Sequence, residues 1–138
     1  MNRCVVLDAG ALEALSGRPD NRSREVRAAL RAASRLGREV VVPAVILAEL
    51  YRGPRHNQMV DACLSRETGI RVRNTDRPLA RLVGGVLAAA GAGSRNLADA
   101  HVIASAVDVG GGIALTTDPG DLGRLAAAYR NVTVIELP

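Results

Sequence analysis

The chain of 138 residues contains no lysine, phenylalanine or tryptophan, and Tyr51 and Tyr129 are its two tyrosines. Modules that bind single-stranded nucleic acid stack bases on aromatic side chains, so this composition leaves almost nothing from which to build such a surface. The two cysteines, Cys4 and Cys63, are far apart and show no C-x-x-C spacing. They fit small apolar residues in a reducing compartment and do not predict a disulfide.

The sequence also lacks a long apolar segment. No stretch approaches the ~20 apolar residues that cross a bilayer, and the N-terminus lacks the parts of a signal peptide. A chain of this length buries roughly two-thirds or more of its unfolded surface. We therefore expect a single domain over 1–138, located in the cytoplasm and without a membrane segment.

Charge is the unusual part of the composition. All eighteen basic residues are arginine, against fourteen acids, so the formal net charge is +4 and the pI is about 10.0. This excess fits a partner that bears phosphate, but it equally fits an acidic protein partner.

Short β-branched runs alternate with longer helical patterns along the whole chain. Strands are predicted at 3–8, 39–43, 69–73, 113–117 and 132–137, and helices at 9–15, 23–36, 44–50, 55–66, 75–91, 96–108 and 118–129. This alternation predicts an α/β fold with a parallel sheet.

Two acids follow predicted strands. Asp8 ends the first strand and Asp118 follows the strand at 113–117, and ligands of open parallel sheets gather beyond such strand ends. Both also have a structural explanation. Asp8 is a favoured helix N-cap, and "DPGD" at 118–121 combines a cap, a proline at the first helical position and a further acid, Asp121.

Two more acids lie on predicted helices. Glu49 falls within the apolar stripe of "AVILAEL", and buried glutamates are rare unless they are paired or ligated; the alternative is a helix-end side chain that reaches solvent. Asp99 is the third helical residue if Asn96 is the cap, a position where an acid favours the helix dipole. It nevertheless shares a face with Val102 and Ile103.

The four acids Asp8, Glu49, Asp99 and Asp118 therefore occupy equivalent ends of elements in an α/β pattern. Carboxylates packed together raise one another's pKa and destabilise the fold, and a divalent cation would remove that penalty. Oxygen ligands favour Mg²⁺ or Mn²⁺ over zinc. We expect no metal contact from His56, placed in a loop at the approximate start of the helix at 55–66, or from His101, which faces away from Asp99.

The segments "VVLDAGAL", "VPAVILAEL", "NLADAHVIASA" and "LTTDPGDL" resemble the PIN domain family, in particular the VapC ribonuclease toxins, in order and spacing over nearly the whole chain. The resemblance implies a PIN-like three-layer α/β/α sandwich with a mainly parallel sheet. It also implies that Asp8, Glu49, Asp99 and Asp118 are catalytic metal ligands and that Asp121 is a further acid of the site.

The resemblance extends to a supporting role for Thr117, expected to steady the site by hydrogen bonding. Gly10 departs from the family, whose members often carry Ser or Thr there, and so does Leu122, which replaces a frequent phenylalanine. A missing hydroxyl at position 10 could weaken ion binding, although it removes none of the carboxylates.

In function, the resemblance implies a Mg²⁺-dependent (or Mn²⁺-dependent) endoribonuclease toxin that hydrolyses tRNA, rRNA or mRNA and is neutralised by a VapB-like antitoxin. It also implies a homodimer, with the helices at 44–66 as the expected contacts. The alternatives are a nuclease that acts on DNA and a catalytically silent PIN-fold binding module. A phosphatase or receiver domain with Asp8 as nucleophile is disfavoured because its paired acids and lysine are absent.

Arginines repeat along one face of the predicted helix at 23–36 and just beyond it. This face carries Arg24, Arg27, Arg31, Arg35 and Arg38. It is either an ordinary solvated surface, an RNA phosphate-binding stripe or a landing site for an acidic segment. Arg52 and Arg55, shortly after Glu49, are further candidates for RNA binding.

Overall fold

The computed structural model describes residues 4–138. Within this range, five parallel strands form one sheet in the order β3-β2-β1-β4-β5. The strands are β1 Cys4–Leu7, β2 Val40–Pro43, β3 Ile70–Arg73, β4 Gly112–Thr116 and β5 Val132–Glu136. All strands therefore end at the same edge of the sheet, which we call the carboxyl edge.

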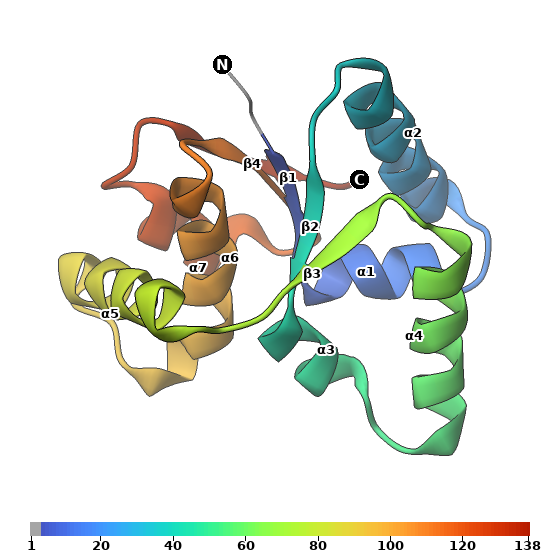
Figure 1. Ribbon diagram of the computed structural model, residues 1–138, viewed down its shortest axis with the longest axis horizontal. Coiled ribbons are helices and arrows are strands. Elements are labelled where there is room, and N and C mark those ends of the chain that lie inside the picture. Colours follow the sequence, from blue (N-terminus) through green and yellow to red (C-terminus); the bar gives the residue numbers. More distant parts are fainter. Residues whose placement is uncertain (1–3) are drawn as a thin grey trace.

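The helices cover both faces of this sheet. They are α1 Ala9–Ser16, α2 Asn21–Arg35, α3 Ala44–Leu50, α4 Pro54–Arg66, α5 Arg77–Ala90, α6 Leu97–Asp108 and α7 Pro119–Ala126, with a 3-10 turn at Ser94–Asn96. Figure 1 shows α1, α2 and α4 on one side of the sheet and α5, α6 and α7 on the other. The predicted three-layer α/β/α sandwich with a parallel sheet is confirmed.

The core lies where β1 and α6 pack together. All four residues of β1 are buried, as expected for a central parallel strand covered on both faces. Helix α6 is buried continuously from Ala100 to Ala106, and its several small side chains suit close packing against a neighbouring layer. Since α6 leads into the start of β4, its first turn lies at the carboxyl edge.

Three local predictions require correction or a limit. Helix α2 begins at Asn21 rather than near Ser23, because Asp20 and Ser23 form a reciprocal capping box with N–O distances of 2.8 Å in each direction. His56 lies in α4 and not in a loop. The first strand was predicted from Arg3, which lies outside the described residues.

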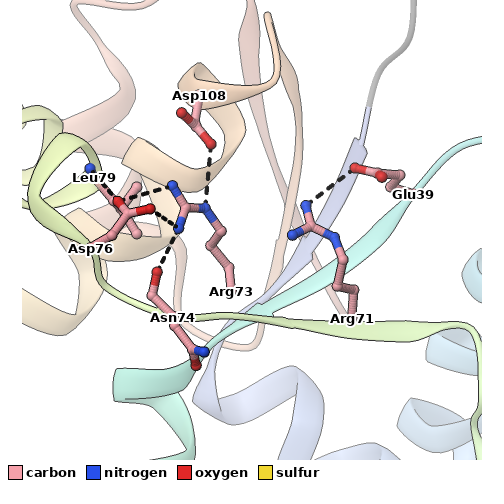
Figure 2. Close-up of polar contacts among 7 residues, drawn as sticks. All are labelled: Glu39, Arg71, Arg73, Asn74, Asp76, Leu79 and Asp108. Carbon is pink, nitrogen blue, oxygen red and sulfur yellow. Dashed lines mark hydrogen bonds and ion pairs between the residues drawn. The ribbon is translucent and has the colours of Figure 1, made fainter.

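Arg73, at the end of β3, ties this edge strand to two helices (Figure 2). Its guanidinium donates to both carboxylate oxygens of Asp76 at 3.1 and 3.3 Å and to Asp108 at 3.4 Å. Asp76 also accepts the backbone N–H of Leu79 at 2.9 Å and thereby caps α5. Because bidentate arginine pairs fix geometry, Arg73 sets the position of α5 relative to β3 and α6.

Cys4 and Cys63 are buried and free, as the sequence predicted. In the described range, no helix has both the length and the apolar character needed to cross a bilayer.

Candidate functional site

Asp8 stands directly beyond β1 and is 8% exposed. One of its carboxylate oxygens accepts the backbone N–H of Ala11 at 2.9 Å and caps α1. Burial raises the pKa of Asp8, and hydrogen bonds from the Thr116 hydroxyl and the backbone N–H groups of Ala11 and Gly10 oppose that rise. The capping alternative is therefore correct, but it leaves the second carboxylate oxygen for other partners.

Asp118 follows β4 and caps α7, where its carboxylate accepts the Gly120 N–H at 3.4 Å. Its own N–H donates to the hydroxyl of Thr116 at 2.9 Å. Asp121 lies in the first turn of α7, 3.9 Å from the guanidinium of Arg124. Here too the capping explanation holds, and the carboxylate of Asp118 is exposed at the carboxyl edge.

The neighbouring acids of the site act together on the pKa of Asp99. Burial in the first turn of α6 raises its pKa to about 6, and four neighbouring carboxylates add to the effect, namely Asp121, Asp8, Glu49 and Asp118 in decreasing order. These are the acids that the sequence singled out. Although they are spread over more than a hundred positions, the fold brings all of them within electrostatic range of one carboxyl group.

Glu49 is exposed, which corrects the prediction that it lies in the buried stripe of α3. The helix turns Ile46 toward the core instead, so the glutamate at its C-terminal end reaches solvent. It lines an open hollow of ≈500 Å³ between α1, α3 and α4, together with Glu13, Arg52 and Arg55. Glu49 thus borders the acidic cluster from outside the core.

Thr116 makes the hydroxyl contacts that the sequence assigned to Thr117. The Thr116 side chain is fully buried. Its hydroxyl accepts the backbone N–H of Asp118 and donates to the carboxyl of Asp8. Thr117 plays a spatial role instead: a Cβ added to Gly10 would stand 2.0 Å from the Thr117 hydroxyl oxygen. The side chain of Thr117 therefore takes up the space that Gly10 leaves free.

The predicted arginines separate into two places. Arg52 and Arg55 lie beside Glu49 in the hollow between α1, α3 and α4, and Arg52 donates to the carbonyls of Ala48 and Tyr51 at the end of α3. Arg27 and Arg31 line another hollow at the opposite edge of the sheet. Arg24 instead donates to Asn21 at the start of α2.

A family model for the PIN domain matches residues 5–128. The chain belongs to the PIN domain family. Its sequence matches none of the curated proteins.

Several solved structures share the fold of this PIN domain. VapBC2 from Rickettsia felis bound to a promoter DNA fragment has a TM-score of 0.67 at 14% identity, with 98% of this chain and 99% of that chain covered. A toxin-antitoxin complex from Klebsiella pneumoniae has a TM-score of 0.66 at 18% identity, with 96% and 99% covered. VapBC-1 from nontypeable Haemophilus influenzae has a TM-score of 0.59 at 14% identity, with 96% and 97% covered.

The side chains of the PIN domain do not form a closed metal cage. Across residues 4–138, no three histidine, cysteine, aspartate or glutamate side chains are close enough to hold one ion. A closed three-ligand cage is therefore absent from the described residues. Mg²⁺ often keeps several waters and is bound by one or two carboxylates, and the groups that gather near Asp99 are oxygen donors.

Two further residues of the site were missed in the sequence. Asn96 is buried, and its side-chain oxygen accepts from Arg124 at 3.1 Å, which joins the start of α6 to α7. The spacing of Arg124, three positions after Asp121 on a helix, could have indicated a cation beside the acids. The role of Asn96 depends on a contact between distant segments, and the sequence carried no sign of it.

Proposed function

We propose that this PIN domain is a Mg²⁺-dependent endoribonuclease of the VapC toxin type. One observation carries the proposal: burial raises the pKa of Asp99 to about 6, and four neighbouring carboxylates add to the rise. Such a concentration of like charge is unfavourable in the free protein. A bound cation would remove this repulsion between the carboxylates, because each of them would then attract the cation.

Asp8 and Asp99 are the proposed central ligands, since Asp8 is buried and Asp99 is partly buried at the carboxyl edge. Glu49, Asp118 and Asp121 are the proposed supporting ligands or water-positioning groups. A divalent cation held by these carboxylates would supply activation of a water molecule and neutralisation of charge on the phosphate. Hydrogen bonds from Thr116 and from the first turn of α1 favour the ionised form of Asp8 and so oppose the rise in its pKa that burial causes.

Arg52 and Arg55 are the proposed RNA-binding residues next to the reacting phosphate. They share a hollow of ≈500 Å³ with Glu49, so a backbone phosphate bound there would lie beside Glu49. The guanidinium of Arg52 is already oriented by two backbone carbonyls, at 2.6 and 2.9 Å. Because the side chain is already oriented, binding a phosphate costs less side-chain entropy.

A cognate antitoxin is the proposed protein partner, because the structural neighbours are described as VapBC or toxin-antitoxin complexes. The exposed flanks of α3 and α4, over 44–66, are the proposed contact region for the antitoxin or for a second copy of the chain. A homodimer in the cytoplasm completes the proposal.

The test is cleavage of single-stranded RNA with and without Mg²⁺ by the wild type and Asp99→Asn. We expect cleavage that requires Mg²⁺ and falls at least ~100-fold in Asp99→Asn, the scale of loss when a group that stabilises the transition state is removed. Asp20→Asn is the matched control, since it alters an aspartate that caps α2.

Equal cleavage by wild type and Asp99→Asn would refute the site. Cleavage of a DNA strand of the same sequence, with RNA left intact, would keep the site and replace the substrate. No cleavage of either, by a protein that binds RNA, would identify a silent binding module.

A further inference from the structure

A second charged hollow lies at the opposite edge of the sheet from the acids. Its volume is ≈470 Å³, and it lies between α2, the end of α4 and the first residues of β2 and β3. Four arginines line it, Arg27, Arg31, Arg38 and Arg66, and we call it the arginine pocket. Figure 1 shows β2 and β3 starting from this end, whereas α3 follows β2 at the other.

Helix dipoles do not account for this grouping. A cation in the last turn of a helix is favourable, and this explains Arg66 at the end of α4. Arg27 and Arg31 precede the last turn of α2, which ends at Arg35, and Arg38 follows the helix. Their convergence on one hollow therefore needs another explanation.

The pocket contains more positive charge than the protein neutralises. Glu67 is its one acid, and it is shared between Arg27 at 3.8 Å and Arg66 at 3.9 Å, both longer than a hydrogen bond. Within the described part of the chain, neither Arg31 nor Arg38 forms an ion pair. Guanidinium groups held together without counter-charges are suited to bind an anion.

The shape and floor of the pocket indicate which anion. Its volume falls within the range of roughly 300–1,000 Å³ typical of small-ligand sites. Leu30, Val40 and Ile70 contribute apolar surface beneath the arginines. Guanidinium forks match phosphate oxygens, and both the apolar floor and guanidinium planes can carry a base, a useful property in a chain without phenylalanine or tryptophan.

We propose that the arginine pocket binds a phosphate-bearing nucleotide. The ligand has two possible sources, a nucleotide of the RNA substrate at a distance from the cleaved bond, or a free nucleoside phosphate. The RNA source rests on the proposed nuclease function, whereas the free-nucleotide source does not. Strands of four or five residues span about 15 Å, so one flexible RNA strand can reach both edges of the sheet.

The first experiment measures binding of adenosine monophosphate to the full chain by calorimetry. We expect Arg31→Gln/Arg38→Gln to bind it at least ~10-fold more weakly than wild type, as for lost hydrogen bonds between charged groups. The matched control Arg77→Gln/Arg81→Gln removes the same charge from α5 and should bind like wild type. If the first pair fails to fold, Arg31→Lys/Arg38→Lys replaces it and should also weaken binding, since lysine lacks the planar fork.

The second experiment measures binding of a single-stranded RNA of about twelve nucleotides to the same pairs, placed in the Asp99→Asn background to prevent cleavage. If the ligand is part of the RNA, the Arg31/Arg38 pair raises the Kd ~10-fold and flattens the salt slope by about 0.7 per lost phosphate contact.

Loss of nucleotide binding with unchanged RNA binding would assign the pocket to a free nucleotide. Equal weakening by both glutamine pairs would overturn the proposal, because net charge alone would then explain binding. So would binding of an acidic peptide in place of either nucleotide ligand. Absence of cleavage in the wild type would refute the nuclease but leave the adenosine monophosphate experiment decisive for the pocket.

Discussion

At the scale of single residues, Asp99 connects the electrostatics of the free protein to its proposed chemistry. Its carboxyl is partly buried in the first turn of α6 and lies in the field of four other acids, so its pKa rises from 3.8 to about 6. The folded chain therefore holds a proton on Asp99 more tightly than the unfolded chain does. Between pH 4 and 6, stability from this group must fall as pH rises.

This sign predicts a stabilising substitution at the centre of the site. In the absence of divalent cations at pH 7, Asp99→Asn should raise the free energy of unfolding by about 1–2 kcal/mol, less than the full value of two pKa units because the side chain is partly exposed. That corresponds to an increase in melting temperature of roughly 3–8 °C. At pH 4, where wild-type Asp99 is protonated in the folded state, the gain should largely disappear.

Thermal unfolding in a chelating buffer at both pH values measures this difference. A gain in stability of the same size at pH 4 and pH 7 would contradict the raised pKa of Asp99.

Gly10 and Thr117 form a second pair whose effects depend on each other. A Cβ at position 10 would stand 2.0 Å from the Thr117 hydroxyl and 3.1 Å from its Cβ. Gly10 is also the second residue of α1, where alanine is intrinsically favoured over glycine by up to ~1 kcal/mol. Steric exclusion and helix propensity therefore oppose each other at this position.

The consequence is a cost that depends on the background. Gly10→Ala should destabilise the wild type by about 1 kcal/mol, as for overpacking partly offset by propensity. In Thr117→Ala, where the clashing hydroxyl is gone but a Cβ remains 3.1 Å away, the same substitution should cost less. Denaturant unfolding of the four proteins of the cycle gives the coupling energy, and additive effects would refute the contact.

At the scale of elements, the course of α5 and the start of α7 could be predicted because residues close together in the sequence determine them. The glycines at 84 and 85 do not interrupt α5, and "DPGD" begins α7 with Asp118 as its cap. The start of α2 was missed because the capping box places Ser23 inside the helix. The prediction that Glu49 is buried was wrong, because its helix is short and turns Ile46 toward the core.

Contacts between distant elements were out of reach of the sequence. Nothing local identifies Asn96 as an acceptor for Arg124, or Thr116 rather than Thr117 as the hydroxyl beside Asp8. The candidate acids were found because each follows a strand or lies at a helix end, positions that a parallel sheet collects at one edge. The sequence alone did not show that these acids and Arg27 and Arg31 lie at opposite edges of the sheet; the structure was needed to see it.

The cap of α7 allows structure and chemistry to be separated at Asp118. Asparagine caps helices about as well as aspartate, so Asp118→Asn should leave the melting temperature within ~1 °C. It should nevertheless lower Mg²⁺-dependent cleavage at least ~10-fold, because a supporting carboxylate is lost. Asp118→Ala should lower both activity and stability, the latter by about 1 kcal/mol.

Parallel melting curves and cleavage assays on the two variants make the comparison. A full-activity Asp118→Asn protein would reduce Asp118 to a helix cap.

At the scale of the whole molecule, the acids around Asp99 and the arginine pocket lie at opposite edges of the sheet. The acids gather at the carboxyl edge around Asp99, and the arginine pocket lies where β2 and β3 begin. A polyanion faces repulsion at the first location unless a cation is bound there, and attraction at the second. Under the two proposals, RNA approach to the acids depends on the metal, whereas RNA anchoring at the arginine pocket does not.

The claim on which this account depends is that the acids around Asp99 together bind a divalent cation. Calorimetric titration of the metal-free protein with Mg²⁺ and Mn²⁺ tests it most directly, with wild type, Asp99→Asn and Asp20→Asn compared at pH 7.

We predict saturable binding to wild type and Asp20→Asn, at least ~10-fold weaker binding to Asp99→Asn, and stabilisation by about 2.7 kcal/mol at a hundredfold excess of metal over Kd. Binding of equal strength to all three proteins, or to none, would contradict the account.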